Sequence, residues 1–223
     1  MNAPSDVRGV MPRWKTVGEL LRSLGDVPAE RVYMNPLPGT ATEAEAYWFN
    51  EHDRTCELVN RTVVEKKKGL PQCYIAGMVT YYLFDYVHGK HERAGIVFPA
   101  GPMYRMKSGN LRSPDASFTQ WERFTRPLPE IADWCPDLCI DVPGPLNTPA
   151  ELSMKREEYF ESGCKLAWEI DLSSRSATIF SDSGRVDLLD ENGFLEGLDV
   201  LPGFQIRLIE ILEHLDRLNS RKE

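Results

Sequence analysis

The segment at residues 136–142, Pro-Asp-Leu-Cys-Ile-Asp-Val, constrains the fold more strongly than any other. On an extended chain, Leu138 and Ile140 point to one side, whereas Cys139 and Asp141 point to the other. The composition predicts a buried strand, yet Asp141 places a carboxylate on it. Because burying an unpaired charge is costly, this carboxylate needs a cationic partner, a metal ion or a solvated strand end.

Helical periodicity is clearest at residues 74–87, where apolar side chains recur at i, i+3 and i+4, and Gly89 is expected to end that helix. Other helices are predicted at residues 17–24, 40–49 and 150–163, and within 204–218 after a strand-like start. Strands are predicted at residues 57–59, 62–64, 94–98, 103–106, 111–118, 138–142, 165–172, 176–180, 186–189 and 194–195. This mixture predicts one α/β (α+β) domain around a largely antiparallel, strongly mixed sheet flanked by helices.

The length of 223 residues suits one domain with a small appendage. We expect an N-terminal appendage at residues 1–50, with a loose tail at 1–12, and the main domain at 51–223. The sequence has no run of about 18 apolar residues, which excludes a membrane-spanning helix. Its polar start carries no signal region, so a cytoplasmic location is expected.

Charge and cysteine content narrow the possible functions. The net charge of -8 disfavours a protein that coats DNA without specificity and raises the odds of an acidic, metal-binding site. The five cysteines are odd in number and irregularly spaced, which argues against a disulfide framework. Cys135 and Cys139 could form half of a zinc site, but no second pair follows, so a structural zinc ion is not expected.

Each of the other candidate catalytic residues also has a simpler interpretation as a structural or surface residue. Asp115 follows Pro114 inside a predicted strand, and Glu57 on its own is a surface glutamate at the start of a hairpin. Lys155 and Tyr159 lie one turn apart on a predicted helix, where lysines are mostly solvated and tyrosines mostly pack in the core. The run at residues 65–68 is most simply a solvated strand end.

Several segments in order resemble the Uma2 family of endonucleases, also catalogued as a domain of unknown function (DUF820). The resemblance covers about residues 50–212. It rests on Glu57-Leu58-Val59, Pro114-Asp115, residues 136–142, Lys155 with Tyr159, residues 163–171 and Leu201-Pro202-Gly203-Phe204. The resemblance implies a restriction endonuclease-like PD-(D/E)XK core.

The same resemblance implies a catalytic site. The family pattern matches Glu57 near the first hairpin, Asp115 in the Pro-Asp strand and Asp141 in the buried strand. The family's lysine, displaced to the following helix, matches Lys155, whereas Asp137 is expected to begin the strand without binding metal. The three acids would hold Mg²⁺ (or Mn²⁺), which activates water for attack on a phosphodiester of DNA.

Three positive residues precede Asp115 and are candidates for phosphate contacts. They are Arg105, Lys107 and Arg112, and the ordinary alternative is a solvated hairpin tip. A homodimer would let two sites cut both strands of DNA.

Two departures from the family pattern keep a second hypothesis open. Position 141 is usually glutamate in the family, and Pro143-Gly144-Pro145 stands where the family has Ser-Pro-Ser. The alternative is therefore a catalytically degenerate module that binds nucleic acid or a partner protein. A hydrolase with a Cys or Ser nucleophile is set aside, because no glycine-flanked nucleophile and no well-placed histidine is present.

Overall fold

A computed structural model describes residues 14–52, 54–90, 94–124 and 126–220 of the chain. The tail expected at residues 1–12 lies outside the described residues. The helices are α1 (Val17–Ser23), α2 (Glu43–His52), α3 (Leu70–Lys90), α4 (Pro149–Glu161) and α5 (Leu208–Ser220), with short 3-10 turns η1 (Ala29–Arg31) and η2 (Trp121–Arg123). Among these described residues, no helix has both the length and the apolar character needed to cross a membrane.

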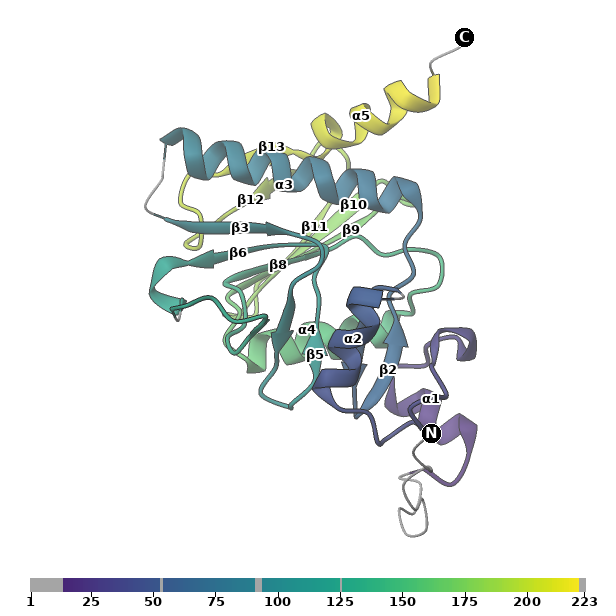
Figure 1. Ribbon diagram of the computed structural model, residues 1–223. Coiled ribbons are helices and arrows are strands. Elements are labelled where there is room, and N and C mark those ends of the chain that lie inside the picture. The colour runs from purple at the N-terminus through teal and green to yellow at the C-terminus, as the bar shows by residue number, and fades with distance from the viewer. Residues whose placement is uncertain (1–13, 53, 91–93, 125, 221–223) are drawn as a thin grey trace.

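The strands form two large sheets and one small one (Figure 1). The six-stranded sheet has the order β11 (Val186–Leu189), β10 (Ser176–Ser181), β9 (Leu166–Asp171), β8 (Leu138–Asp141), β6 (Ala116–Gln120) and β3 (Gly95–Pro99). The five-stranded sheet has the order β2 (Thr62–Glu65), β1 (Cys56–Val59), β5 (Leu111–Arg112), β4 (Met103–Arg105) and β7 (Ile131–Ala132). A two-stranded sheet joins β12 (Phe194–Glu196) to β13 (Gln205–Arg207). The mixed α+β class with mixed sheet structure flanked by helices is confirmed, and the strands divide among more than one sheet.

The predicted strand at residues 111–118 is in fact two strands in different sheets. β5 pairs with β1 and β4, whereas β6 pairs with β3 and β8. The chain crosses between the sheets at Ser113 and Pro114, and proline lacks the N–H needed to continue a ladder. Asp115 rejoins the second sheet by donating its backbone N–H to the Ile140 carbonyl at 2.8 Å. The sheet crossing therefore places Asp115 between the two sheets.

The two faces of the six-stranded sheet carry different layers. In Figure 1, α3 and α5 lie on one side of this sheet and α4 on the other. Leu138 and Ile140 belong to the large apolar core that includes α3 and α5. Cys139 belongs to a smaller cluster with Tyr159 of α4 and Tyr104 of β4. The predicted alternation along β8 is therefore confirmed, and its polar face looks toward α4.

Two helix boundaries differ from the sequence prediction. The helix expected at residues 74–87 extends from Leu70 to Lys90 and continues through Gly89. Pro71 is tolerated because it lies in the first turn, where its missing N–H is not needed. Helix α4 begins at Pro149, one residue before the predicted start, because the Thr148 hydroxyl caps it by accepting from the Glu151 N–H at 3.0 Å, and it ends at Glu161.

The N-terminal segment is tied to the rest of the chain by a buried ion pair. The Arg31 guanidinium donates to both carboxylate oxygens of Glu151 on α4, at 2.7 and 2.6 Å. Val32 also forms a β-bridge with Val64 of β2. The division of the chain near residue 50 stays a prediction.

Candidate active site

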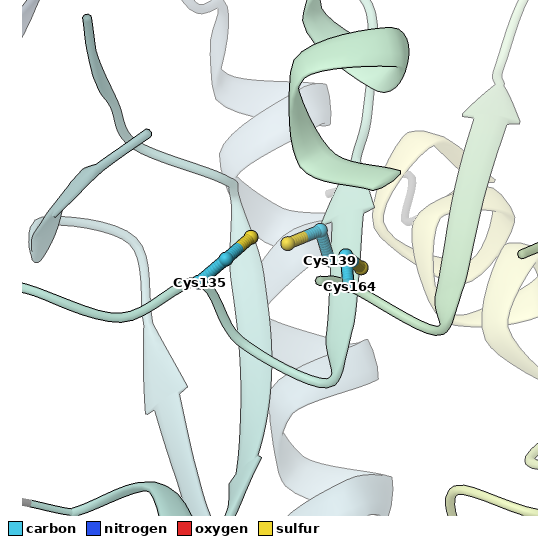
Figure 2. Close-up of side chains that lie close together, drawn as sticks. All are labelled: Cys135, Cys139 and Cys164. Carbon is cyan, nitrogen blue, oxygen red and sulfur yellow. The ribbon is translucent and has the colours of Figure 1, made fainter. Parts of the chain in front are cut away.

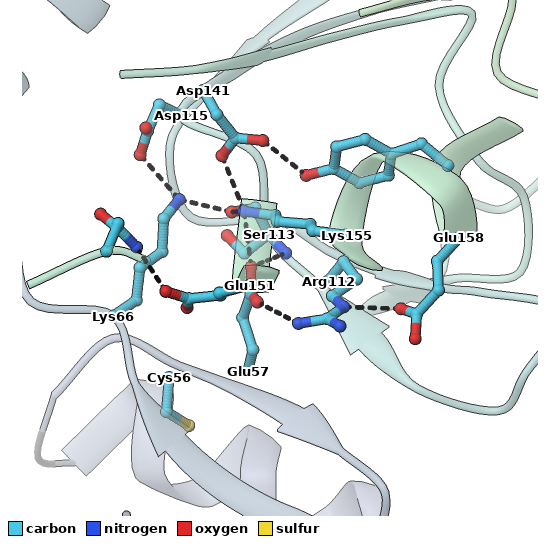
Figure 3. A network of polar contacts seen from close by, with 12 residues as sticks. Cys56, Glu57, Lys66, Arg112, Ser113, Asp115, Asp141, Glu151, Lys155 and Glu158 are labelled. Carbon is cyan, nitrogen blue, oxygen red and sulfur yellow. Dashed lines mark hydrogen bonds and ion pairs between the residues drawn. The ribbon is translucent and has the colours of Figure 1, made fainter. Parts of the chain in front are cut away.

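The four residues predicted to be catalytic lie in one buried polar cluster (Figure 3). They come from elements far apart in the sequence. Glu57 lies on β1, Asp115 at the crossing between β5 and β6, Asp141 at the end of β8, and Lys155 on α4. The cluster therefore occupies the space where the two large sheets and α4 meet.

Lys155 connects two of the acids. Its Nζ atom lies 2.9 Å from Glu57 Oε1 and 2.7 Å from Asp141 Oδ1. One turn further along α4, the Tyr159 hydroxyl donates to Asp141 Oδ2 at 3.1 Å. Both side chains project from one face of the helix, as the i, i+4 spacing predicts. Lys155 and Tyr159 together fix the Asp141 carboxylate. Lys155 is therefore not a solvated surface lysine, and Tyr159 does more than pack in the core.

Asp115 is held by two lysines that the sequence did not assign to the site. Lys66 Nζ lies 2.7 Å from Asp115 Oδ1, and Lys68 Nζ lies 2.8 Å from Oδ2. The Val142 backbone N–H also donates to Oδ2 at 2.7 Å. The interpretation of this lysine run as a solvated strand end is wrong for Lys66 and Lys68, which are largely buried, and right for Lys67, which is exposed. The i, i+2 spacing on an extended chain could have revealed that the first and third lysines face the same side.

These contacts change the electrostatic argument for a metal ion. Three converging carboxylates would by themselves repel one another and favour a metal ion, but here each carboxylate contacts at least one ammonium group. The acids are Glu57, Asp115 and Asp141, and the ammonium groups belong to Lys66, Lys68 and Lys155. The cluster is therefore balanced in charge by the chain itself.

The proposed phosphate contacts do not form one surface. Arg112 is buried, with one guanidinium nitrogen 2.9 Å from Glu57 and another 2.6 Å from Glu158, so the interpretation of this arginine as a phosphate contact is wrong. Arg105 is half-exposed and donates to both carboxylate oxygens of Glu43 at 2.7 Å. Lys107 is exposed. The hairpin therefore leaves Lys107, and to a lesser degree Arg105, accessible to a ligand.

Burial and the neighbouring positive charges shift the pKa values of the acids in opposite directions. Burial raises the pKa of the Glu57 carboxyl, but the charges of Lys155 and Arg112 outweigh burial and hold the pKa below its usual range. Burial likewise raises the pKa of Asp115, and Lys66 and Lys68 more than reverse the effect. Both carboxyls are therefore ionised at neutral pH.

The lysines respond differently to the same environment. Burial lowers the pKa of Lys155, but Asp141 and Glu57 outweigh burial and raise the pKa above its usual range. For Lys68, burial prevails over the attraction of Asp115, and the pKa is lowered. Lys155 is thus the more firmly charged of the two groups.

A cavity of about 350 Å³ reaches this cluster from one side. Lys66, Lys68 and Asp115 line its polar end. The remaining lining residues lie just before β1, on α3, and at and after the end of β3. They are Thr55, Cys73, Ala76, Gly77, Thr80, Pro99 and Ala100. Asp115 is therefore the acid that a ligand entering this cavity meets.

The oxygen atoms around the lysines are chemically suited to a hard divalent cation. Lys68 also donates to the Val142 carbonyl at 2.7 Å, and Lys66 donates to the Ser113 carbonyl. Carboxylate and carbonyl oxygens are the ligands that Mg²⁺ prefers. The Ser113 hydroxyl is buried and has no hydrogen-bond partner among the described residues. The donor types are those of a Mg²⁺ or Mn²⁺ site, but ammonium groups contact these carboxylates, and the three acids do not lie as close together as the ligands of one ion. Binding of such an ion would require an ammonium group such as that of Lys68 to move away and the carboxylates to converge.

Asp137 has a structural role, as expected. It immediately precedes β8 and is fully buried. Its carboxylate accepts from the Gln120 backbone N–H at 2.9 Å and from Arg123 Nε at 2.8 Å. Asp137 therefore anchors the start of the strand that ends in Asp141.

Comparison of the whole chain with known proteins identifies first a shared fold and then a family. The chain resembles the crystal structure of a "putative nuclease belonging to DUF820" from Anabaena variabilis, with a TM-score of 0.66 at 15% identity, over 75% of this chain and 96% of that chain. This likeness shows that the two chains share an α+β fold. The model of the Uma2 family, described as "Putative restriction endonuclease", matches residues 42–209, and the chain belongs to that family. Among curated proteins, none matches the chain.

Proposed function

We propose that this chain is a metal-dependent endonuclease that hydrolyses DNA phosphodiester bonds through Glu57, Asp115, Asp141 and Lys155. The observation that carries the proposal is the position of the Lys155 ammonium, between Glu57 and Asp141 and 3.5 Å from the Ser113 carbonyl in the crossing that contains Asp115. Membership of a family described as restriction endonucleases supports the same chemistry.

Asp115 and Asp141, with Glu57, are the residues that would hold Mg²⁺ (or Mn²⁺). When bound, such an ion supplies Lewis acidity toward water and toward the phosphodiester. Asp115 immediately precedes β6, which pairs with β8, and Asp115 contacts the backbone of both neighbours of Asp141: its N–H donates to the Ile140 carbonyl, and its carboxylate accepts from the Val142 N–H. Tyr159 holds Asp141 in position through its hydroxyl.

The lysines supply fixed positive charge where a phosphate would gain negative charge. Lys155 is buried and firmly charged, which makes it the candidate for stabilising the transition state. Lys68 lines the cavity and contacts Asp115, so it can shift toward an incoming phosphate. DNA is the proposed substrate, with Lys107 and Arg105 as outer phosphate contacts and a homodimer as the assembly that would cut both strands.

The test is nicking of supercoiled plasmid in the presence of Mg²⁺ or Mn²⁺. Wild type should nick DNA, whereas Asp115→Asn and Lys155→Met should lose nicking. Asp85→Asn and Lys67→Met are matched controls, because both side chains are exposed and lie outside the cluster. Full nicking by both site variants would contradict the assignment of the site.

A second function is favoured by the internal charge balance of the cluster. Because lysines neutralise the acids, the chain has the properties of a degenerate module that keeps the fold and binds nucleic acid or a partner protein. Thermal unfolding with Mg²⁺ or Mn²⁺ discriminates the two functions, because an ion that binds the native state raises Tm. A rise that disappears in Asp141→Asn supports the nuclease, and no rise supports the module.

A further inference from the structure

Three cysteine side chains meet on the face of β8 that carries Asp141 (Figure 2). Cys135 follows β7, Cys139 lies on β8, and Cys164 lies in the turn between α4 and β9. Their Sγ atoms all lie within 4.8 Å of one another, and all three residues are buried. Within the described residues, no other group of three thiol, imidazole or carboxylate side chains is as close. The cluster brings together three segments that the sequence keeps apart.

Backbone hydrogen bonds fix the segments that carry Cys139 and Cys164, and the Cys135 thiol lies 3.7 Å from the Tyr159 carbonyl. The Asp137 carbonyl accepts hydrogen bonds from the N–H groups of Lys165 and Leu166, both at 3.0 Å. The Cys164 N–H donates to the Tyr159 carbonyl at 2.9 Å, which fixes the turn after α4. Because these backbone bonds do not involve sulfur, the ligand atoms are positioned before any ion arrives. Such preorganisation lowers the conformational cost of binding.

The surroundings of the cluster suit a thiolate complex. The neighbouring side chains are apolar or aromatic and include Tyr104, Tyr159 and Trp134. The Trp134 indole N–H is buried and has no hydrogen-bond partner among the described residues, so a donor is available in the layer around the sulfur atoms. Donors of this kind stabilise metal-bound thiolates.

Positive charge lies close to the cluster. The Arg123 guanidinium donates to the carbonyl of Gly163, the residue before Cys164, and to the Asp137 carboxylate. Lys165 Nζ lies 3.3 Å from the same carboxylate. The two cations and one carboxylate leave one net positive charge, which would offset the single negative charge of a divalent ion bound to three thiolates.

We propose that Cys135, Cys139 and Cys164 form a binding site for a soft, thiophilic metal ion of the Zn²⁺ class. Sulfur ligands select such ions over Mg²⁺ or Mn²⁺. On binding, the three thiols release three protons to solvent and three metal–sulfur bonds form, with no change of oxidation state. The ion joins the loop before β8, the strand itself and the end of α4. The three thiolates leave one of the four positions of a tetrahedral ion to a further ligand, and the site is separate from the proposed hard-cation site.

The experiment is a titration of the reduced, metal-free chain with Cd²⁺, followed by the ultraviolet charge-transfer absorbance of cadmium–thiolate bonds. Wild type should show a band that saturates at one ion per chain, and added Zn²⁺ should displace it. Cys139→Ser and Cys164→Ser should each weaken or abolish the band. Cys73→Ser is the matched control, because Cys73 is exposed on α3 and lies outside the cluster, and it should leave the band unchanged.

The result that would overturn the proposal is the absence of a saturable band in wild type, or a band that survives in both cluster variants. X-ray absorption of the zinc-loaded wild type gives a second test that needs no variant. Three sulfur atoms around zinc support the site, and a shell of oxygen and nitrogen alone contradicts it. The Asp115→Asn/Asp141→Asn double variant should keep the cadmium band even if it no longer binds Mn²⁺, which separates this proposal from the nuclease proposal.

Discussion

The carboxylate–lysine cluster and the cysteine cluster share one face of β8, yet different forces hold them together. Asp141 depends on Lys155 and Tyr159, whose side chains contact it directly. Cys139, two residues earlier, lies among thiols that are positioned by backbone hydrogen bonds around Asp137. The first cluster is therefore sensitive to the loss of any one charge. The second should tolerate the loss of a single sulfur atom while losing its proposed ligand.

The largest expected loss of stability comes from removing the Lys155 ammonium group. Lys155→Met leaves Glu57 and Asp141 buried without their shared cation, which should lower the free energy of unfolding by about 3–5 kcal/mol. Urea denaturation measures this loss. Lys67→Met changes an exposed lysine next to Lys66 and Lys68, and should remain within about 0.5 kcal/mol of wild type. Equal stability of the two variants would mean that the buried ion pairs do not hold the cluster together.

Acid should weaken the same cluster by a smaller amount. The pKa values of Glu57 and Asp115 lie below their ordinary values of 4.5 and 3.8, so the native state binds fewer protons than the unfolded chain. This stabilisation is complete above these ordinary values and is lost as the pH falls below them, by about 2–3 kcal/mol for one such carboxylate. Chemical unfolding measured from pH 6 downward checks the slope.

The Asp115→Asn variant sharpens this pH test. It removes the Asp115 carboxyl, whose pKa is lowered in the folded chain, so its stability should fall less steeply with acid than that of wild type. Asp85→Asn changes an exposed residue and should keep the wild-type slope. Identical slopes in all three proteins would show that Asp115 does not titrate between the folded and unfolded states.

The smallest expected loss of stability comes from removing one thiol of the cysteine cluster in the metal-free chain. Cys135→Ala removes one packed sulfur atom and should cost about 1 kcal/mol. Differential scanning calorimetry with and without Zn²⁺ measures both this loss and the proposed gain from the ion. Zinc should raise the Tm of wild type more than that of the variant. A loss as large as that of Lys155→Met would mean that the backbone hydrogen bonds do not hold this region by themselves.

The sequence predicted the parts of the fold that depend on local pattern. The alternation along β8 and the existence of helix α4 both rest on neighbouring residues and are confirmed. The division of residues 111–118 between two sheets was missed, because strand periodicity says nothing about which partner strand each half meets. Pro114 was the available signal for the crossing.

The same limit applies to the site. The resemblance selected Glu57, Asp115, Asp141 and Lys155, and the fold brings them together. Lys66 and Lys68 were missed because a lysine run at a strand end is normally solvated, and their burial depends on Asp115, which lies far along the chain. Cys164 was not joined to Cys135 and Cys139 for the same reason, since its approach depends on the turn between α4 and β9.

The central claim is that Asp115 and Asp141 form a hard-cation site, and isothermal titration of Mn²⁺ tests it most directly. Wild type and the Asp115→Asn/Asp141→Asn variant are compared under identical conditions, with circular dichroism confirming that both are folded. The account predicts saturable Mn²⁺ binding to wild type that the double variant loses. No binding to folded wild type, or unchanged binding to the double variant, would contradict it.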